Sequence, residues 1–291
     1  MDIISIIAAF GGGVIGAYLG AVPAFIMTGV FALVGAVTGI GFATGVMAFG
    51  VFLSPAVAFG GGVAAAAYAG KKGKLASGAD VTSALNGLGS PDVLVVGGIF
   101  GIIGWLCQYV ASLIPAGFGT DNPGVGVIIV GIISRLVFGK TGLLGKYENG
   151  EKKQLITSSA LGNNLVLGAA LGLVIGCIYA GAPADVRPNL AVIVFGFSAI
   201  TLAFAVMGLA TPATHHITLP SALGAAAFCA VMGGSAAGAI IGGIVFGVLG
   251  SILGDFFGNL LNSHCDSHID PPACTIVTLT FLANIITTIA A

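Results

Sequence analysis

The stretches Val14-Ile15-Gly16 and Pro23-Ala24 return in the second half of the chain as Val174-Ile175-Gly176 and Pro183-Ala184. Three later stretches match in the same order. They are Pro55 with Pro220, Gly97-Gly98-Ile99-Phe100-Gly101 with Gly242-Gly243-Ile244-Val245-Phe246-Gly247, and Asp121-Asn122-Pro123 with Asp270-Pro271-Pro272. Because the matches keep their order, the sequence predicts two homologous halves, residues 1–145 and 160–291, joined by a linker at 146–159.

The composition excludes an ordinary soluble domain. The chain is 57% hydrophobic and 7% charged, with a mean hydropathy of +1.12, whereas soluble domains carry about 25% charged residues. A net charge of −1 gives no electrostatic reason to expect a nucleic-acid partner. The first apolar segment has no basic region before it, so we expect it to be a retained membrane helix and not a cleaved signal.

Apolar segments near the length of a membrane span, about 20 residues, recur along the chain. In the first half they cover residues 3–22, 24–47, 52–70, 93–114 and 123–139. In the second half they cover residues 160–182, 188–209, 217–233, 236–261 and 272–290. The sequence therefore predicts an all-α, polytopic integral membrane protein with five segments in each half, in contact with the lipid bilayer.

The third segment of each half, 52–70 and 217–233, is short, rich in alanine and glycine, and has a proline near its start. Proline removes a backbone donor from a helix, and broken helices survive in a membrane only where protein or a watery cavity satisfies the freed groups. A close-packed small-residue helix is one interpretation. A broken or re-entrant helix that lines a path is the interpretation we favour.

Lysines set the expected topology. They follow the third segment and the fifth segment of the first half, which predicts that loops 71–92 and 140–159 are cytoplasmic. If the third segments cross fully, the halves are inverted and both termini lie outside. If they re-enter, the halves are parallel and both termini lie inside. The near absence of positive charge at the N-terminus favours the inverted 5+5 arrangement.

This plan, with two five-segment repeats and a short proline-marked third segment in each, resembles the general plan of inverted-repeat permeases and of urea-transporter-like channels. The resemblance covers nearly the whole chain. It implies a membrane transporter or channel whose solute site lies between the repeats. It implies no particular solute.

Glycines spaced four residues apart predict close helix contacts, because helices in lipid associate through packing. One such face holds Gly12, Gly16 and Gly20, and another holds Gly250, Gly254 and Gly258 beside Gly243 and Gly247. Packing of these faces within the chain is the first interpretation. A subunit interface in a homo-oligomer is the second.

Two ionisable residues lie well inside predicted spans, Arg135 and Asp255. A charge in the bilayer normally faces the protein interior and has a partner, so we expect these two to meet each other or the solute. Snorkelling of Arg135 to the surface is the alternative. Their counterparts in the other half are Asn284 and Tyr109, which are neutral but polar, as expected for positions that face a cavity.

Polar side chains also stand at the start of segment 217–233. His215, His216 and Thr218 precede Pro220, and imidazoles at such a place can bind a solute or relay protons. With Pro55 in the other half, they complete the predicted solute path. A surface loop is the alternative for the two histidines.

Residues 263–272 hold a second polar cluster. In an extended segment His264, Asp266, His268 and Asp270 point to one side, and two imidazoles with two carboxylates suit zinc or another divalent ion. A polar gate, or a solvated loop in which aspartate caps the next helix, are the alternatives. The equivalent Asp121 before Pro123 favours the cap, while the histidines have no counterpart in the first half.

We therefore expect a permease or channel that moves a small polar solute between the repeats. So few buried carboxylates favour facilitated passage over strong ion coupling. Divalent-metal transport or sensing through loop 264–270, and a structural role in a larger membrane complex, are the alternatives. The sequence has no phosphate-binding, nucleotide-binding or hydrolase motif, so we expect no enzyme activity.

Overall fold

The computed structural model describes residues 2–115, 118–147 and 151–290, and within them it is helical with no strand. The helices of the first half are α1 (Ile3–Leu19), α2 (Ala21–Thr38), η1 (Ala43–Ala48), η2 (Pro55–Phe59), α3 (Gly60–Lys71), η3 (Leu85–Leu88), α4 (Pro91–Ala111) and α5 (Asn122–Phe138). Those of the second half are α6 (Ser158–Gly181), η5 (Arg187–Asn189), α7 (Leu190–Ile200), α8 (Leu202–Val206), α9 (His215–Val231), α10 (Ala236–Leu261) and α11 (Pro271–Ala290). The predicted all-α class is confirmed.

Local sequence explains where several helices begin and end. Asp2 caps α1, because its carboxylate accepts a hydrogen bond from the Ser5 amide at 2.7 Å. Proline stands in the first turn of η2, α4 and α5, where the missing amide hydrogen costs nothing. Gly39 ends α2 with a φ of 73°, a conformation that favours glycine.

Among the described residues, six helices are long and apolar enough to cross a membrane. They are Ala21–Thr38, Pro91–Ala111, Ser158–Gly181, Arg187–Val206, Ala236–Leu261 and Pro271–Ile289. Helices α1, α5 and α9 are apolar but shorter. The outer surface carries large apolar side chains such as Ile4 and Val166, which are 74% and 71% exposed. Each of the ten predicted segments contains a helix, and this surface is consistent with a membrane protein.

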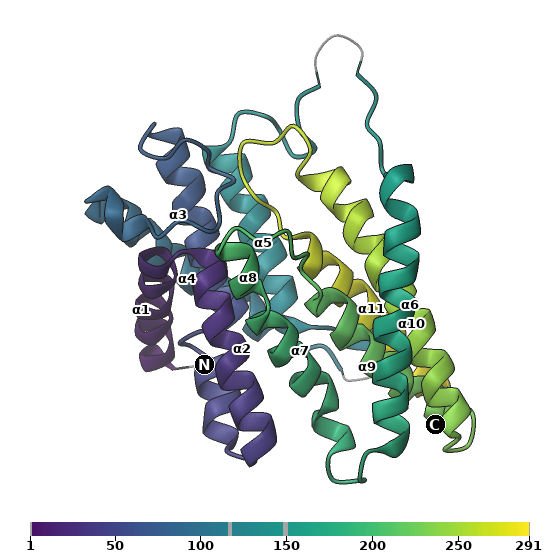
Figure 1. The fold of residues 1–291 in the computed structure, drawn as a ribbon. Coiled ribbons are helices and arrows are strands. Elements are labelled where there is room, and N and C mark those ends of the chain that lie inside the picture. The colour runs from purple at the N-terminus through teal and green to yellow at the C-terminus, as the bar shows by residue number, and fades with distance from the viewer. Residues whose placement is uncertain (1, 116–117, 148–150, 291) are drawn as a thin grey trace.

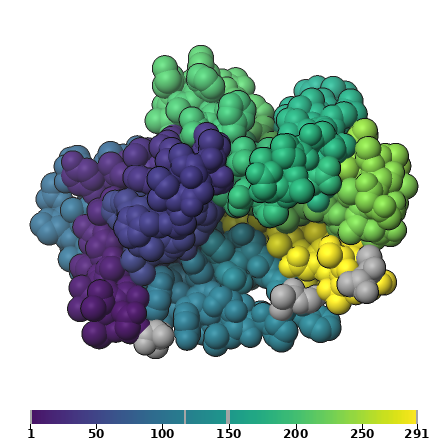
Figure 2. Space-filling model, turned by 90° about the horizontal axis from the view of Figure 1, so that it is seen from below, coloured from purple at the N-terminus to yellow at the C-terminus, as the bar shows by residue number. Residues whose placement is uncertain are grey.

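The helices form two bundles that share an interface (Figures 1 and 2). In the first bundle α1, α4 and α5 pack around η2–α3, and in the second α6, α10 and α11 pack around α9. Helices α2 and α7 pack against each other across the interface, and α5 contacts α11. Almost every residue from Gly60 to Ala69 is buried, so the small third segments are the inner helices of their bundles.

Glycine permits close helix contacts inside each bundle. A Cβ at Gly12 would lie 2.5 Å from the Phe52 carbonyl oxygen, and one at Gly250 would lie 2.6 Å from that of His216. Gly243 packs in the same way against Gly172, which joins α10 to α6. The glycine faces predicted from sequence are thus largely occupied within the chain, as their first interpretation has it, and the homo-oligomer stays a prediction.

The two prolines of the third segments have different places. Pro55 is the first residue of η2, at the start of the continuous helical stretch Pro55–Lys71. Pro220 lies inside α9, and the helix continues through it. The prediction of a proline-broken helix at 217–233 is therefore wrong. Pro220 lies early in α9, so its ring removes only a bond to the carbonyl of His216 near the helix start.

One end of the molecule gathers the lysine-bearing loops. Lys146 donates a backbone hydrogen bond to the His264 carbonyl at 3.1 Å, and Gly78 forms a bridge with Ser267. The N and C labels both lie in the lower half of Figure 1, away from these loops.

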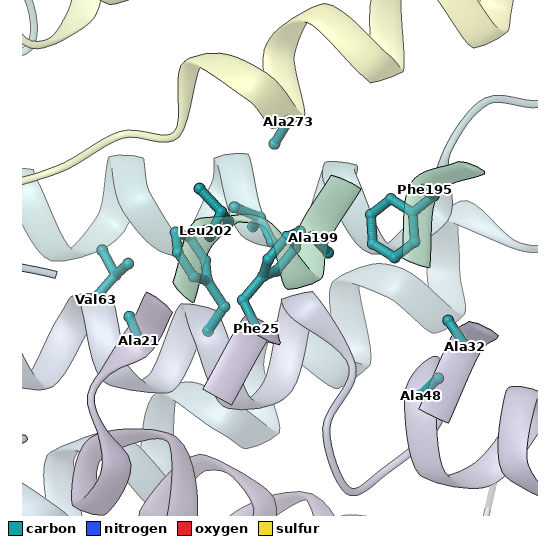
Figure 3. Close-up of a cluster of buried hydrophobic side chains, with 11 residues drawn as sticks. Ala21, Phe25, Ala32, Ala48, Val63, Phe195, Ala199, Leu202 and Ala273 are labelled. Atoms are coloured by element: carbon teal, nitrogen blue, oxygen red, sulfur yellow. The ribbon is translucent and has the colours of Figure 1, made fainter. Parts of the chain in front are cut away.

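A cluster of buried apolar side chains fills the junction between the bundles (Figure 3). It takes Phe25 from α2, Phe195 and Ala199 from α7, Leu202 from α8 and Ala273 from α11. Apolar contact between halves distant in sequence therefore fixes how the bundles sit against each other.

Candidate functional site

A cavity of about 510 Å³ lies beside this cluster, at the junction of the two bundles. Its wall includes the starts of four helical stretches: Pro55 of η2–α3, Asp121 to Gly124 at α5, His215 of α9 and Asp270 before α11. Small-molecule sites typically measure about 300–1,000 Å³. The cavity is therefore large enough for a small solute and takes equivalent elements from both halves.

The N-terminal end of α5 packs along the middle of α11, while Gly131 inside α5 packs against Ile269, the neighbour of Asp270. The Thr120 hydroxyl donates to the Val277 carbonyl at 2.5 Å, and the Asn284 side-chain amide donates to the Gly119 carbonyl at 2.9 Å. A Cβ at Gly124 would lie 2.8 Å from the side chain of Val277. These contacts bring the capping residues of both helices to one cavity.

Two carboxylates line the cavity. Asp121 accepts a hydrogen bond from the Gly124 amide at 2.6 Å. Asp270 accepts one from the Ala273 amide at 2.8 Å and lies 3.2 Å from His268 Nε2. The cap predicted for both halves is confirmed, and each carboxylate is partly accessible from the cavity.

Aromatic rings form much of the remaining wall. They come from both halves and comprise Phe25, Phe49, Phe59, Trp105, Tyr109 and Phe195. The ring centroids of Phe25 and Phe195 are 5.5 Å apart, and Trp105 stacks on Tyr109 at 5.7 Å. None of the described lining residues is lysine or arginine.

Gln108 holds the chain segment before η2 against this wall. Its side-chain oxygen accepts from the Ser54 hydroxyl at 2.5 Å, and its amide nitrogen donates to the Phe49 carbonyl at 2.6 Å. The non-helical stretch between η1 and η2 is thereby fixed by a side chain of α4.

His215 places an imidazole in the cavity wall. Its side chain packs on Phe25 with ring centroids 4.8 Å apart, and the residue is only 5% exposed. Its Nδ1 atom is buried and has no hydrogen-bond partner among the described residues. A buried nitrogen without a partner is costly, and this atom is enclosed by protein although the residue itself lines the cavity.

Three of the residues predicted for the solute path line this cavity: Pro55, Tyr109 and His215. The others lie elsewhere. His216 packs against Gly254, and the Thr218 hydroxyl lies 2.6 Å from that of Ser198. Pro220 is buried inside α9, and Asn284 holds Gly119.

Arg135 is a buried anchor for the loop before α11. It is 1% exposed and donates to the Leu143 carbonyl at 2.9 Å, to Asn262 Oδ1 at 3.0 Å and to Ser267 Oγ at 3.0 Å. Asp255 instead accepts a hydrogen bond from the Thr157 amide at 2.9 Å. The predicted contact between Arg135 and Asp255 is therefore wrong, because each side chain has partners of its own.

The four residues predicted to bind metal do not converge. His264 lies 3.8 Å from Glu151, Asp266 accepts from the Lys140 amide at 2.6 Å, and His268 pairs with Asp270. His264 has a φ of 58°, so the loop is not extended and its side chains do not alternate. Within the described ranges no three His, Cys, Asp or Glu side chains gather in a way that could hold a metal ion.

The sequence reasoning missed Asp121 and the aromatic wall as parts of a site. Asp121 was interpreted as a helix cap alone. Its signal was the recurrence of aspartate before proline in both halves, at the start of the last segment of each.

Residues 1–156 and 163–291 match the model of a family of unknown function, DUF7973, and the chain belongs to that family. No curated protein and no solved structure matches the chain.

Proposed function

We propose that this member of the DUF7973 family is an integral membrane protein that moves a small solute through the cavity between its two halves. The observation that carries the proposal is the convergence of equivalent helix starts from both halves on one cavity of about 510 Å³. Transporters built from two repeats commonly hold their solute at the interface between the repeats.

The contact pattern supports a duplicated, inverted plan. Helix α1 packs on α4 as α6 packs on α10, and η2–α3 contacts α5 as α9 contacts α11. A twofold axis between the halves would interchange α2 with α7 and α5 with α11. The two helices of each pair pack on each other, as such an axis predicts. With the lysine loops at one end, both termini lie at the other, as the inverted 5+5 arrangement predicts.

The apolar exterior supports insertion in a bilayer. Large side chains on the outside, such as Leu136 and Phe197 at 64% and 66% exposure, would be costly in water. In lipid the same side chains are matched to their surroundings, while the polar groups that line the cavity stay inside the bundle.

A flux assay tests the proposal. Sealed liposomes that contain the purified protein are mixed rapidly with urea, ammonia, formate, glycerol or a small ammonium ion, and stopped-flow light scattering follows the entry of each solute.

Ala191→Trp fills the cavity from α7, and Val166→Trp is the matched control on the exposed face of α6. We expect flux above empty liposomes for the wild type and V166W, and about tenfold less in A191W, since the added ring occupies the path. Flat traces for every solute, or equal flux in A191W, would overturn the proposal.

A further inference from the structure

We infer that the cavity binds a small organic cation, of the ammonium class, between the carboxylates of Asp121 and Asp270 and the surrounding aromatic rings. The inference deepens the proposed function and rests on it for the role of the cavity as a solute site. The inference gives the solute a positive charge, whereas the proposed function leaves the charge of the solute open.

The charge of the wall favours a cation. Two carboxylates line the cavity, and none of the described lining residues is lysine or arginine. Buried carboxylates need a partner, and Asp121 has a single hydrogen-bond donor, the Gly124 amide, among the described residues. A cation in the cavity compensates the charge of the carboxylates that line it.

The rings add the second recognition element. One wall runs through Phe59, Phe25, Phe195 and Phe49 in that order, and successive ring centroids are 5.7, 5.5 and 5.6 Å apart. Trp105 and Tyr109 belong to the lining as well. Aromatic faces attract cations, and aromatic boxes are the usual protein site for alkylammonium groups, whereas small inorganic ions prefer oxygen ligands.

His215 adds a polar side chain to the wall. Its side chain is more than nine-tenths buried, it lines the cavity, and its Nδ1 has no partner among the described residues. This Nδ1 and the Thr280 hydroxyl are both enclosed by protein atoms, so the imidazole forms part of the wall and neither atom is offered to the ligand.

The chain contains its own reporter for the test. Trp105 is the one tryptophan of the sequence, and it lies in the cavity wall. Its emission is therefore recorded while choline, butylammonium and the uncharged choline isostere 3,3-dimethyl-1-butanol are titrated into the purified full-length protein in lipid nanodiscs.

We expect saturable changes with choline or butylammonium and none with the isostere. Asp121→Asn and Asp270→Asn should each weaken cation binding by about tenfold or more, as the loss of a close charge does. Asparagine keeps the helix cap, so these variants remove charge alone. Asp255→Asn is the matched control, because Asp255 is bound to Thr157 and does not line the cavity.

Equal responses to choline and its isostere, or no saturable response to either cation, would overturn the inference even if the variants failed to fold. An unchanged affinity in both folded variants would overturn it too. Cation binding without flux would support the inference and overturn the proposed transport. Flux of neutral solutes without cation binding would support the proposed transport and overturn the inference.

Discussion

Helices α5 and α11 begin in the same way, yet their surroundings differ. Both follow an aspartate that caps the helix and lines the cavity. Asp121 has one hydrogen bond, to its own helix, among the described residues, while Asp270 also pairs with His268 at 3.2 Å. The loop before Asp270 is further held by Arg135 and Asn262.

The comparison separates what both helix starts share from what one of them has in addition. The carboxylate and its amide partner recur because both helices need a cap. The histidine and the arginine-anchored loop occur in the second half alone. The negative charge of Asp121 is thus offset by fewer hydrogen bonds than that of Asp270. Asp270 is also held more firmly, because its loop is anchored.

The largest effect should come from removing the anchor on the α11 side. Arg135→Ala leaves the carbonyls of Leu143 and Ser267 without their donor and should lower the free energy of unfolding by about 3–5 kcal/mol. Thermal unfolding in detergent measures it, with exposed Lys140→Ala as control. Equal midpoints for the two variants would show that the loop does not depend on this side chain.

The two charges should then differ in their effect on cation binding. D121N should weaken choline binding about threefold more than D270N, because the hydrogen bond from His268 already compensates part of the Asp270 charge. The Trp105 titration gives both dissociation constants. A larger loss in D270N would reverse the comparison.

The caps themselves should be alike. D121A and D270A should each be less stable than the corresponding asparagine variant by about 1 kcal/mol, since alanine cannot accept the amide hydrogen bond. Unfolding midpoints of the four variants measure this. If alanine and asparagine were equally stable at either site, the carboxylate there would not act as a cap.

The smallest effect should come from removing the hydrogen bond between His268 and Asp270. His268→Ala removes its side-chain partner and should tighten choline binding by about threefold, the value of one hydrogen bond. His264→Ala is the control, because His264 lies beside Glu151, away from the cavity lining. If H268A bound choline more weakly and H264A did not, the main role of His268 would be to position Asp270 and not to offset its negative charge.

Much of the fold follows from the sequence because it depends on local pattern. Apolar length predicted the segments, and aspartate before proline marked the helix starts at Asp121 and Asp270. Pro220 shows the limit, since a proline in the first turns of a helix does not break it.

The site was less predictable because it depends on contacts distant in the chain. Tyr109 and His215 were found as polar groups in apolar segments. The partners of Arg135 lie in loops far along the sequence, and the φ of His264 ended the alternation on which the metal site relied. The aromatic wall gave no signal, since phenylalanine in a membrane segment is ordinary.

The central claim is that Asp121 and Asp270, one from each half, face a single solute. A double-mutant cycle tests it most directly, with choline affinity measured through Trp105 in the wild type, D121N, D270N and the double variant. We predict a coupling free energy of about 0.5 kcal/mol or more, as for groups that share one ligand. Losses that add within about 0.3 kcal/mol would show that the two carboxylates act independently and would contradict a shared site.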